Sequence, residues 1–285
     1  MKHSIIVFTA FLISAMSYGQ FQISASGGYA IGSAGMKLGE TVSLSETENS
    51  YGSYGEGLNA QLRGTYFFND TFGLDLSLGY LHGSDQTVSK VNVPGTEIDA
   101  VARARAYGAA LSLVYKFNKN TYARLGALGK LGGKTEAVVY RKATFTDAER
   151  AENGLPSGSY SETNYVEDYH GHFPLGVVAA LGYEFELDTN FSLFVEAEYY
   201  GISLKRKDSE ITEFNSDIFT GDGTLVATYT LDNLPEGTDK ITTYVDNLSN
   251  TNTDTSKELA VKVPYSSFGI NFGIIYKFKG SSKKQ

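Results

Sequence analysis

The sequence contains no cysteine and no tryptophan, and only five of its 285 residues are proline. The absence of cysteine excludes disulfide bonds and excludes lipid attachment at an N-terminal cysteine. Beyond the N-terminus, no apolar run approaches about 18 residues, which excludes a helical membrane protein. The net charge is −8 and the basic residues form no clusters, so binding to nucleic acid is not expected.

The N-terminus has the features of an export signal. Lys2 gives a positive start, an apolar run follows from Ile5 to Met16, and small residues precede a cleavage point after Gly19. We predict that residues 1–19 are a signal peptide and that residues 20–285 form one mature domain. The apolar run is too short to cross a bilayer as a helix.

Glycine, tyrosine and phenylalanine are abundant, with 31, 20 and 17 residues, yet the mean hydropathy is only −0.20. Strands that alternate apolar and polar residues produce this combination. The clearest case is the segment 267–278, where six apolar or aromatic residues fall on one face and small or polar residues on the other. The apolar set is Phe268, Ile270, Phe272, Ile274, Tyr276 and Phe278.

The same alternation predicts eight strands in all. They are expected around residues 21–31, 58–68, 72–80, 107–117, 121–131, 173–185, 191–199 and 267–278. Three links between them are short and rich in Asn and Asp, which suit tight hairpin turns: 69–71, 118–120 and 188–190. The other four links are long: 33–57, 84–100, 142–169 and 205–257.

Short and long links alternate, as in barrels of the bacterial outer membrane. Aromatic residues also bracket the apolar faces at separations of eight to twelve residues. Ten residues at about 3.3 Å each, tilted by about 40°, rise about 25 Å, the height of a lipid-facing band. The predicted fold is therefore all-β, an eight-stranded antiparallel transmembrane up-and-down β-barrel in the outer membrane with long extracellular loops.

The final strand, Phe268–Phe278, ends in Ile-Tyr-Lys-Phe and resembles the terminal strand of outer-membrane barrels. The mature chain is similar to the small eight-stranded families of outer membrane protein A and outer membrane protein W. The resemblance implies recognition of this strand by the barrel-assembly machinery. It leaves residues 279–285 as a short periplasmic tail.

Nine charged residues are predicted to face the inside of the barrel. The acids are Asp75, Glu184, Glu186, Glu196 and Glu198, and the bases are Arg63, Lys116, Arg124 and Lys277. A network of ion pairs that plugs the lumen is one interpretation, because buried charges need partners. A narrow gated pore for small solutes is the alternative. Glu196 and Glu198 could also be called paired carboxylates, but the four bases favour ion pairing.

A second group of cations falls on the outward phase, above the upper aromatic residues: His82, Arg103, Arg105, Lys205 and Lys207. Guanidinium and ammonium groups at this height could contact the phosphates of outer-membrane lipid and lipopolysaccharide. An ordinary solvated rim is the alternative.

A third interpretation is lipid chemistry, since His82-Gly83-Ser84 resembles the His–Ser pair of outer-membrane lipid A deacylases. That match is three residues long and lacks an acidic orienting residue. We therefore predict no catalytic residue, no metal site and no cofactor. A structural role with surface interactions through the long loops is the expected function. Within those loops, residues 146–150 predict a capped helical turn and Gly221-Asp222-Gly223 the turn of a hairpin.

Overall fold

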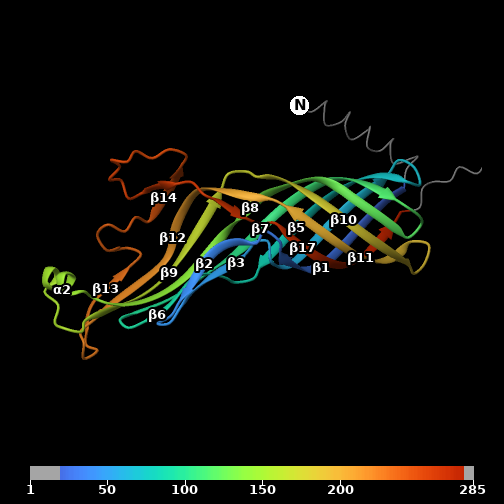
Figure 1. The fold of residues 1–285 in the computed structure, drawn as a ribbon. Helices are drawn as coiled ribbons and strands as arrows, with labels where there is room; N and C mark the ends of the chain where they lie inside the picture. Colours follow the sequence, from blue (N-terminus) through green and yellow to red (C-terminus); the bar gives the residue numbers. More distant parts are fainter. Residues whose placement is uncertain (1–19, 279–285) are drawn as a thin grey trace, which may run out of the picture.

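The computed structural model describes residues 20–278, which form seventeen strands and one helix (Figure 1). The predicted signal peptide and the tail 279–285 lie outside the described residues. Within the described part, no helix is long and apolar enough to cross a membrane.

Eight strands form the barrel. They are β1 (Gln20–Gly32), β4 (Gly57–Phe67), β5 (Phe72–Gly83), β7 (Thr96–Lys116), β8 (Thr121–Thr144), β10 (Leu175–Glu186), β11 (Phe191–Gly201) and β17 (Ser267–Lys277). Each pairs antiparallel with its neighbours in the order β1-β4-β5-β7-β8-β10-β11-β17, and β17 pairs back with β1. The ring is closed, so the prediction of an eight-stranded up-and-down barrel is confirmed.

The barrel strands alternate between an apolar outer face and a polar inner face. On β7, Leu111 and Leu113 are exposed, whereas Ser112 between them is buried. The same contrast recurs around the ring, with exposed apolar residues on every strand: Leu62, Leu76, Leu125, Leu181, Leu193, Phe272 and Ile274 among them. A water-soluble barrel has the opposite arrangement, and the exposed apolar belt fits a surface that faces lipid.

The three short turns lie together at one end of the barrel, which we call the short-turn end (Figure 1). Each is closed by one side-chain oxygen that accepts two backbone N–H groups, at 2.7–2.9 Å. The acceptors are Asn69, Asn118 and Asp188. This local bonding explains why Asn and Asp occupy the turns, and the three predicted turns are confirmed.

At the opposite end, the long-loop end, several strands continue far past the barrel (Figure 1). β7 and β8 have 21 and 24 residues. β8 pairs there with β9 (Tyr160–Gly171), and β9 pairs with β12 (Ser203–Phe219). We call this region the projecting sheet. The prediction that residues 84–100, 142–169 and 205–257 are loops was therefore wrong for much of their length.

Shorter strands complete the projecting sheet: β2 (Met36–Val42), β3 (Thr47–Gly52), β6 (Gln86–Val93), β13 (Leu225–Thr230), β14 (Ile241–Val245), β15 (Lys257–Leu259) and β16 (Lys262–Pro264). β6 pairs with β7 and also with β2, which carries β3. β13, β14 and β16 each pair with part of β12, and β15 pairs with β14. The region predicted as loop at 33–57 is thus also partly strand.

Two local predictions at this end are confirmed. Helix α2 (Asp147–Asn153) begins after Thr146, which forms a reciprocal capping box with Glu149. β12 and β13 form a hairpin whose turn contains Gly221-Asp222-Gly223, and Gly223 has a φ of +86°, which only glycine adopts readily.

Between the barrel and the projecting sheet, the wall is interrupted on one side. β8 pairs with β10 up to Gly129 and with β9 from Thr135 onward, so residues 130–134 lack a partner strand on that side. A small apolar cluster, which we call the neck, lies at the same level. It consists of Tyr54, Ala102, Ala104, Ala106, Leu204 and Tyr265.

Candidate functional site in the barrel lumen

The middle of the lumen holds a compact ion-pair network. Arg63 on β4 contacts both carboxylate oxygens of Glu196 on β11 at 2.9 Å. Arg124 on β8 contacts Glu196 at 2.7 Å, Glu198 at 2.6 Å and Asp75 at 3.2 Å. All five side chains are almost completely buried. Charges this far from water are tolerable only when each meets opposite charges and hydrogen-bond partners, as here.

Uncharged side chains complete the network, and the sequence analysis did not identify them. The Tyr122 hydroxyl donates to Glu196 at 2.8 Å, and the side-chain amides of Gln61 and Asn271 donate to Glu198 at 2.6 and 2.7 Å. Gln61 also donates to Tyr200 at 2.6 Å. The alternation of the strands could have identified two of them. Gln61 lies two residues from Arg63, and Tyr122 lies two residues from Arg124, so both share the inward phase of these arginines.

A second group of ion pairs lies nearer the short-turn end. Lys277 is 3.0 Å from Glu184 and 3.7 Å from Glu186, and Lys116 is 3.7 Å from Glu184. Lys116 also lies over the Phe67 ring at 4.3 Å. Glu186 is 56% exposed, so its predicted place inside the lumen was wrong: it lies at the rim. The structure therefore brings all nine predicted residues into two groups along the barrel axis.

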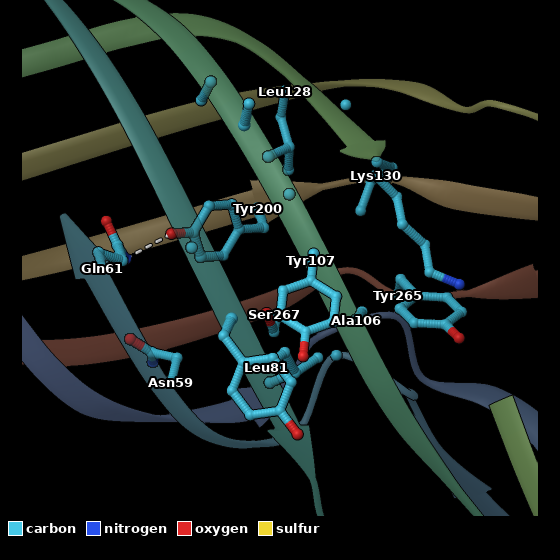
Figure 2. Close-up of a pocket in the computed structure, with 18 of the residues that line it drawn as sticks. Asn59, Gln61, Leu81, Ala106, Tyr107, Leu128, Lys130, Tyr200, Tyr265 and Ser267 are labelled. Atoms are coloured by element: carbon cyan, nitrogen blue, oxygen red, sulfur yellow. Dashed lines mark hydrogen bonds between the residues drawn. The ribbon is translucent and has the colours of Figure 1, made fainter. Parts of the chain in front are cut away.

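Above the central network, toward the long-loop end, the lumen contains a cavity of about 110 Å³. Seven of the eight barrel strands contribute to its lining, together with residues 55, 174, 202, 204 and 265. Figure 2 shows Asn59, Gln61 and Tyr200 on one side and Lys130 with Tyr265 on the other. Most of the remaining wall is small or apolar, with Ala106, Gly108, Ala110, Leu128 and Leu204.

The neck lies at the upper side of this cavity. Leu204 and Tyr265 belong to both the neck and the lining, and the Tyr54 and Tyr265 rings are 5.8 Å apart. Burial raises the pKa of Tyr265 to about 12, so its hydroxyl stays protonated and can share a hydrogen bond with Thr135. The cavity thus lies between a polar network and an apolar neck.

The predicted outward cations occupy two separate places. His82 and Arg105 are cross-strand partners on β5 and β7. Lys205 and Lys207 lie on β12, which follows β11 and so continues the barrel wall several strands away. The five residues therefore do not form one site.

Most of these cations already have partners within the protein. Arg103 contacts Glu136 at 3.0 Å and Asp85 at 3.4 Å, and Lys207 contacts Asp208 at 3.0 Å. Arg105 donates to the backbone carbonyls of Gly83 and Ala104 at 2.8 and 2.9 Å, and Lys205 pairs with Asp246. This pairing weakens the case for a phosphate clamp built from Arg103 and Arg105.

A cleft missed by the sequence analysis lies beside Lys205. It is lined by the basic residues His172, Lys205 and Lys262 together with Phe173, Leu175 and Tyr199. The last three belong to the exposed apolar belt or its upper edge. Sequence phase could not reveal this cleft, because Lys262 reaches Lys205 only through the β12–β16 pairing.

The His82–Ser84 pair does not have the geometry of a nucleophile and its base. The Ser84 hydroxyl is hydrogen-bonded to the Tyr29 hydroxyl at 3.1 Å, and His82 Nδ1 lies 3.5 Å from the Tyr80 hydroxyl. Within residues 20–278, no group of three or more His, Asp or Glu side chains is arranged to hold a metal ion.

Comparison with solved structures identifies other outer-membrane barrels at low sequence identity. Neisserial surface protein A is 12% identical, with a TM-score of 0.33, and the alignment covers 90% of this chain and 97% of that one. Ail of Yersinia pestis, in complex with the heparin analogue sucrose octasulfate, is 12% identical, with a TM-score of 0.33. That alignment covers 91% of this chain and 97% of Ail. Outer membrane protein AlkL, whose structure was determined in lipid bilayers, is 15% identical, with a TM-score of 0.36. That alignment covers 94% of this chain and 95% of AlkL.

Among curated proteins, none matches the chain in sequence. A family match is found, however: residues 5–220 match the family described as outer membrane protein beta-barrel domain. That span is more than half of the chain and includes seven of the eight barrel strands in full, all except β17. The chain therefore belongs to the outer membrane protein β-barrel domain family and is a transmembrane β-barrel of the outer membrane.

Proposed function

We propose that the barrel is a closed membrane anchor and that the projecting sheet is a contact surface on the outside of the cell. The observation that carries this proposal is the continuity of β7 and β8 from the barrel into the sheet. Residues 131–144 of β8 add roughly 45 Å of strand beyond the barrel wall. A sheet held this way is a rigid platform rather than a set of mobile loops.

The lumen supports the anchor part of the proposal. Arg63 and Arg124 cross the middle of the barrel to reach acids on other strands, and their contacts occupy the cross-section there. An eight-stranded barrel has an interior that side chains can fill. A passage for solutes would require this network to open, and breaking buried ion pairs is costly.

Orientation and closure can be tested together. Epitope tags inserted near Asn153 or Asp222 should be detected on intact cells, whereas a tag at Lys119 should require permeabilised cells. The purified protein should give no steady conductance in planar bilayers. Reversed labelling would contradict the proposed orientation, and a steady nanosiemens conductance would favour a channel for small solutes.

A lipid contact is proposed for the cleft at His172, Lys205 and Lys262. Its cations lie directly above the lipid-facing belt, where phosphate groups of lipopolysaccharide would lie. Lys205 also pairs with Asp246, whereas Lys262 forms no salt bridge with the described residues. Substituting Lys205 and Lys262 with Gln should reduce co-purified lipopolysaccharide, while Arg103→Gln with Arg105→Gln should not. If the wild type and the Lys205→Gln, Lys262→Gln variant retain equal amounts of lipopolysaccharide, this assignment is contradicted.

A further inference from the structure

The cavity above the ion-pair network has a combination of features that the anchor role does not require. Its wall is mostly apolar, which does not attract water, yet it is not filled by side chains. Small residues on β5 and β7, including Gly79, Gly108 and Ala110, create the space. A concave, largely apolar chamber with a few polar groups is the usual form of a small-molecule site.

Lys130 is the distinctive polar group of this chamber. Its phase on β8 is that of Tyr122 and Arg124, so its side chain points inward (Figure 2). Its ammonium lies 5.3 Å from the centre of the Tyr265 ring and 3.4 Å from the carbonyl oxygen of Gly133. With the described residues it forms no salt bridge, unlike the four bases deeper in the lumen.

The network below cannot supply the missing charge. Glu198, the uppermost of its acids, already accepts from Arg124, Gln61 and Asn271. Asn59 provides a second open polar contact on the other side of the chamber. Its Oδ1 atom is buried and has no hydrogen-bond partner among the described residues.

We propose that this chamber binds a small monocarboxylate with an apolar body, with the carboxylate at Lys130 and the body against Leu128, Ala106 and Ala110. A carboxylate would neutralise the ammonium, and the apolar body would replace water along the wall. Lys130 and Pro174 line the chamber, and Lys130 begins the segment of β8 that has no partner strand on one side. We place the entrance for the ligand at this segment. This inference goes beyond the surface role and does not depend on it.

Octanoate is a suitable probe, because it is soluble and carries one carboxylate on an eight-carbon chain. Calorimetry on the full barrel in lipid nanodiscs, with empty nanodiscs subtracted, should show saturable binding of octanoate. Octyltrimethylammonium, with the same chain and the opposite charge, should not bind saturably. No saturable octanoate signal, or equal binding of the cation, would overturn the proposal.

Variants of Lys130 locate the site. Lys130→Met keeps the apolar stem but removes the charge, and should weaken octanoate binding by about tenfold or more. Lys130→Arg should stay close to the wild type. The matched control Lys142→Met removes a lysine from the same strand, far from the chamber, where Lys142 pairs with Glu162. It should bind octanoate as the wild type does.

Filling the chamber with a larger side chain is an independent test that leaves the charge of Lys130 in place. Leu128→Trp should abolish octanoate binding while the barrel still shows heat-modifiable mobility on gels. The new residue is also the only tryptophan in the chain, so its fluorescence reports whether the ring is in an apolar place. Wild-type affinity in both Lys130→Met and Leu128→Trp would show that octanoate binds elsewhere.

Discussion

Strand β8 passes through two environments, and its charged residues behave differently in each. In the lumen, Arg124 is about 2% exposed and contacts three carboxylates. In the projecting sheet, Lys134 is 34% exposed and contacts Asp168 and Glu136 at 2.7 and 3.4 Å. The backbone ladder is the same in both places. What differs is water, which can solvate an unpaired charge in the sheet but does not reach the ion-pair network around Arg124.

The two regions also differ in what lies behind each strand. At the level of the ion-pair network, inward side chains from different strands meet, so this part of the lumen is a packed polar core. The projecting sheet is closed only near the barrel, where the neck packs Leu204 and Tyr54 against Ala104. Farther out, residues such as Leu225 and Ile241 are more than half exposed. We therefore expect stability to fall from the lumen through the neck to the tip.

The largest expected effect comes from Glu196→Gln in the lumen. Arg63 would lose the carboxylate that it contacts on both oxygens, and among the described residues it has no other salt bridge. An uncompensated buried charge costs about 3–5 kcal/mol. Urea unfolding of the barrel in phospholipid vesicles, followed by gel mobility, should show this loss.

The matched control for that variant is Glu186→Gln, which removes the same charge from an exposed position at the rim of the barrel. Exposed ion pairs contribute about 0–1 kcal/mol, so Glu186→Gln should unfold close to the wild type. Equal losses for the two variants would show that burial does not distinguish the lumen charges.

An intermediate effect is expected from Leu204→Ala in the neck. Leu204 is 3% exposed and fills the space over Gly171, where its Cγ lies 2.3 Å from the position that a Cβ would take. Removing the side chain should cost about 2–5 kcal/mol locally. Amide hydrogen exchange should accelerate in β12 and β16 while β1 and β17 stay protected.

Leu225→Ala is the control for the neck variant, since Leu225 is 54% exposed on β13. It should change exchange in β12 only slightly, because exposed substitutions usually alter stability within about 0.5 kcal/mol. Faster exchange throughout the barrel in Leu204→Ala would mean that the neck and the barrel unfold as one unit.

The barrel was predictable because lipid imposes a strong pattern on its sequence. On β7, Leu111 and Leu113 had to be apolar and Ser112 small and polar. The extension of β7 into the projecting sheet alternates too, with Ala102 and Ala104 inward and Arg103 and Arg105 outward. Alanine is small, so its alternation with arginine gives only a weak periodic pattern of hydrophobicity. A sheet with water on both faces does not require a strong alternation of apolar and polar residues. For this reason the sequence predicts loops where these strands lie.

The candidate site was predictable in part, for a related reason. Charges on the inward phase identified Arg63, Arg124 and Glu196, since a buried charge needs an opposite one. The chamber exists because positions on many strands carry small side chains. Only the register of the strands brings these positions together in space. Lys130 follows the same phase as Arg124, yet its lack of a partner is a property of three-dimensional packing.

The smallest effect is expected from acid acting on the ion pairs of the projecting sheet. Arg103 on β7 pairs with Glu136 on β8. Glu136 faces Asp168 on β9, and Lys134 contacts both of these carboxylates. Partial burial alone would raise the pKa of Glu136. The hydrogen bond from Arg103 and the charge of Lys134 outweigh this and hold the pKa below its ordinary value of 4.5.

A carboxyl group with a lowered pKa stabilises the folded state fully above its unfolded pKa, and the contribution disappears as the pH falls through the folded pKa. Exchange of the Arg103 and Glu136 amides should therefore be equally slow, after correction for intrinsic rates, between pH 7 and pH 5, and faster below pH 4. In Glu136→Gln this acid-dependent step should be absent. Above pH 5, the free energy of opening of this region should differ between Glu136→Gln and the wild type by no more than about 1 kcal/mol. An acid-dependent step of the same size in Glu136→Gln would contradict the assignment of the effect to this carboxyl group.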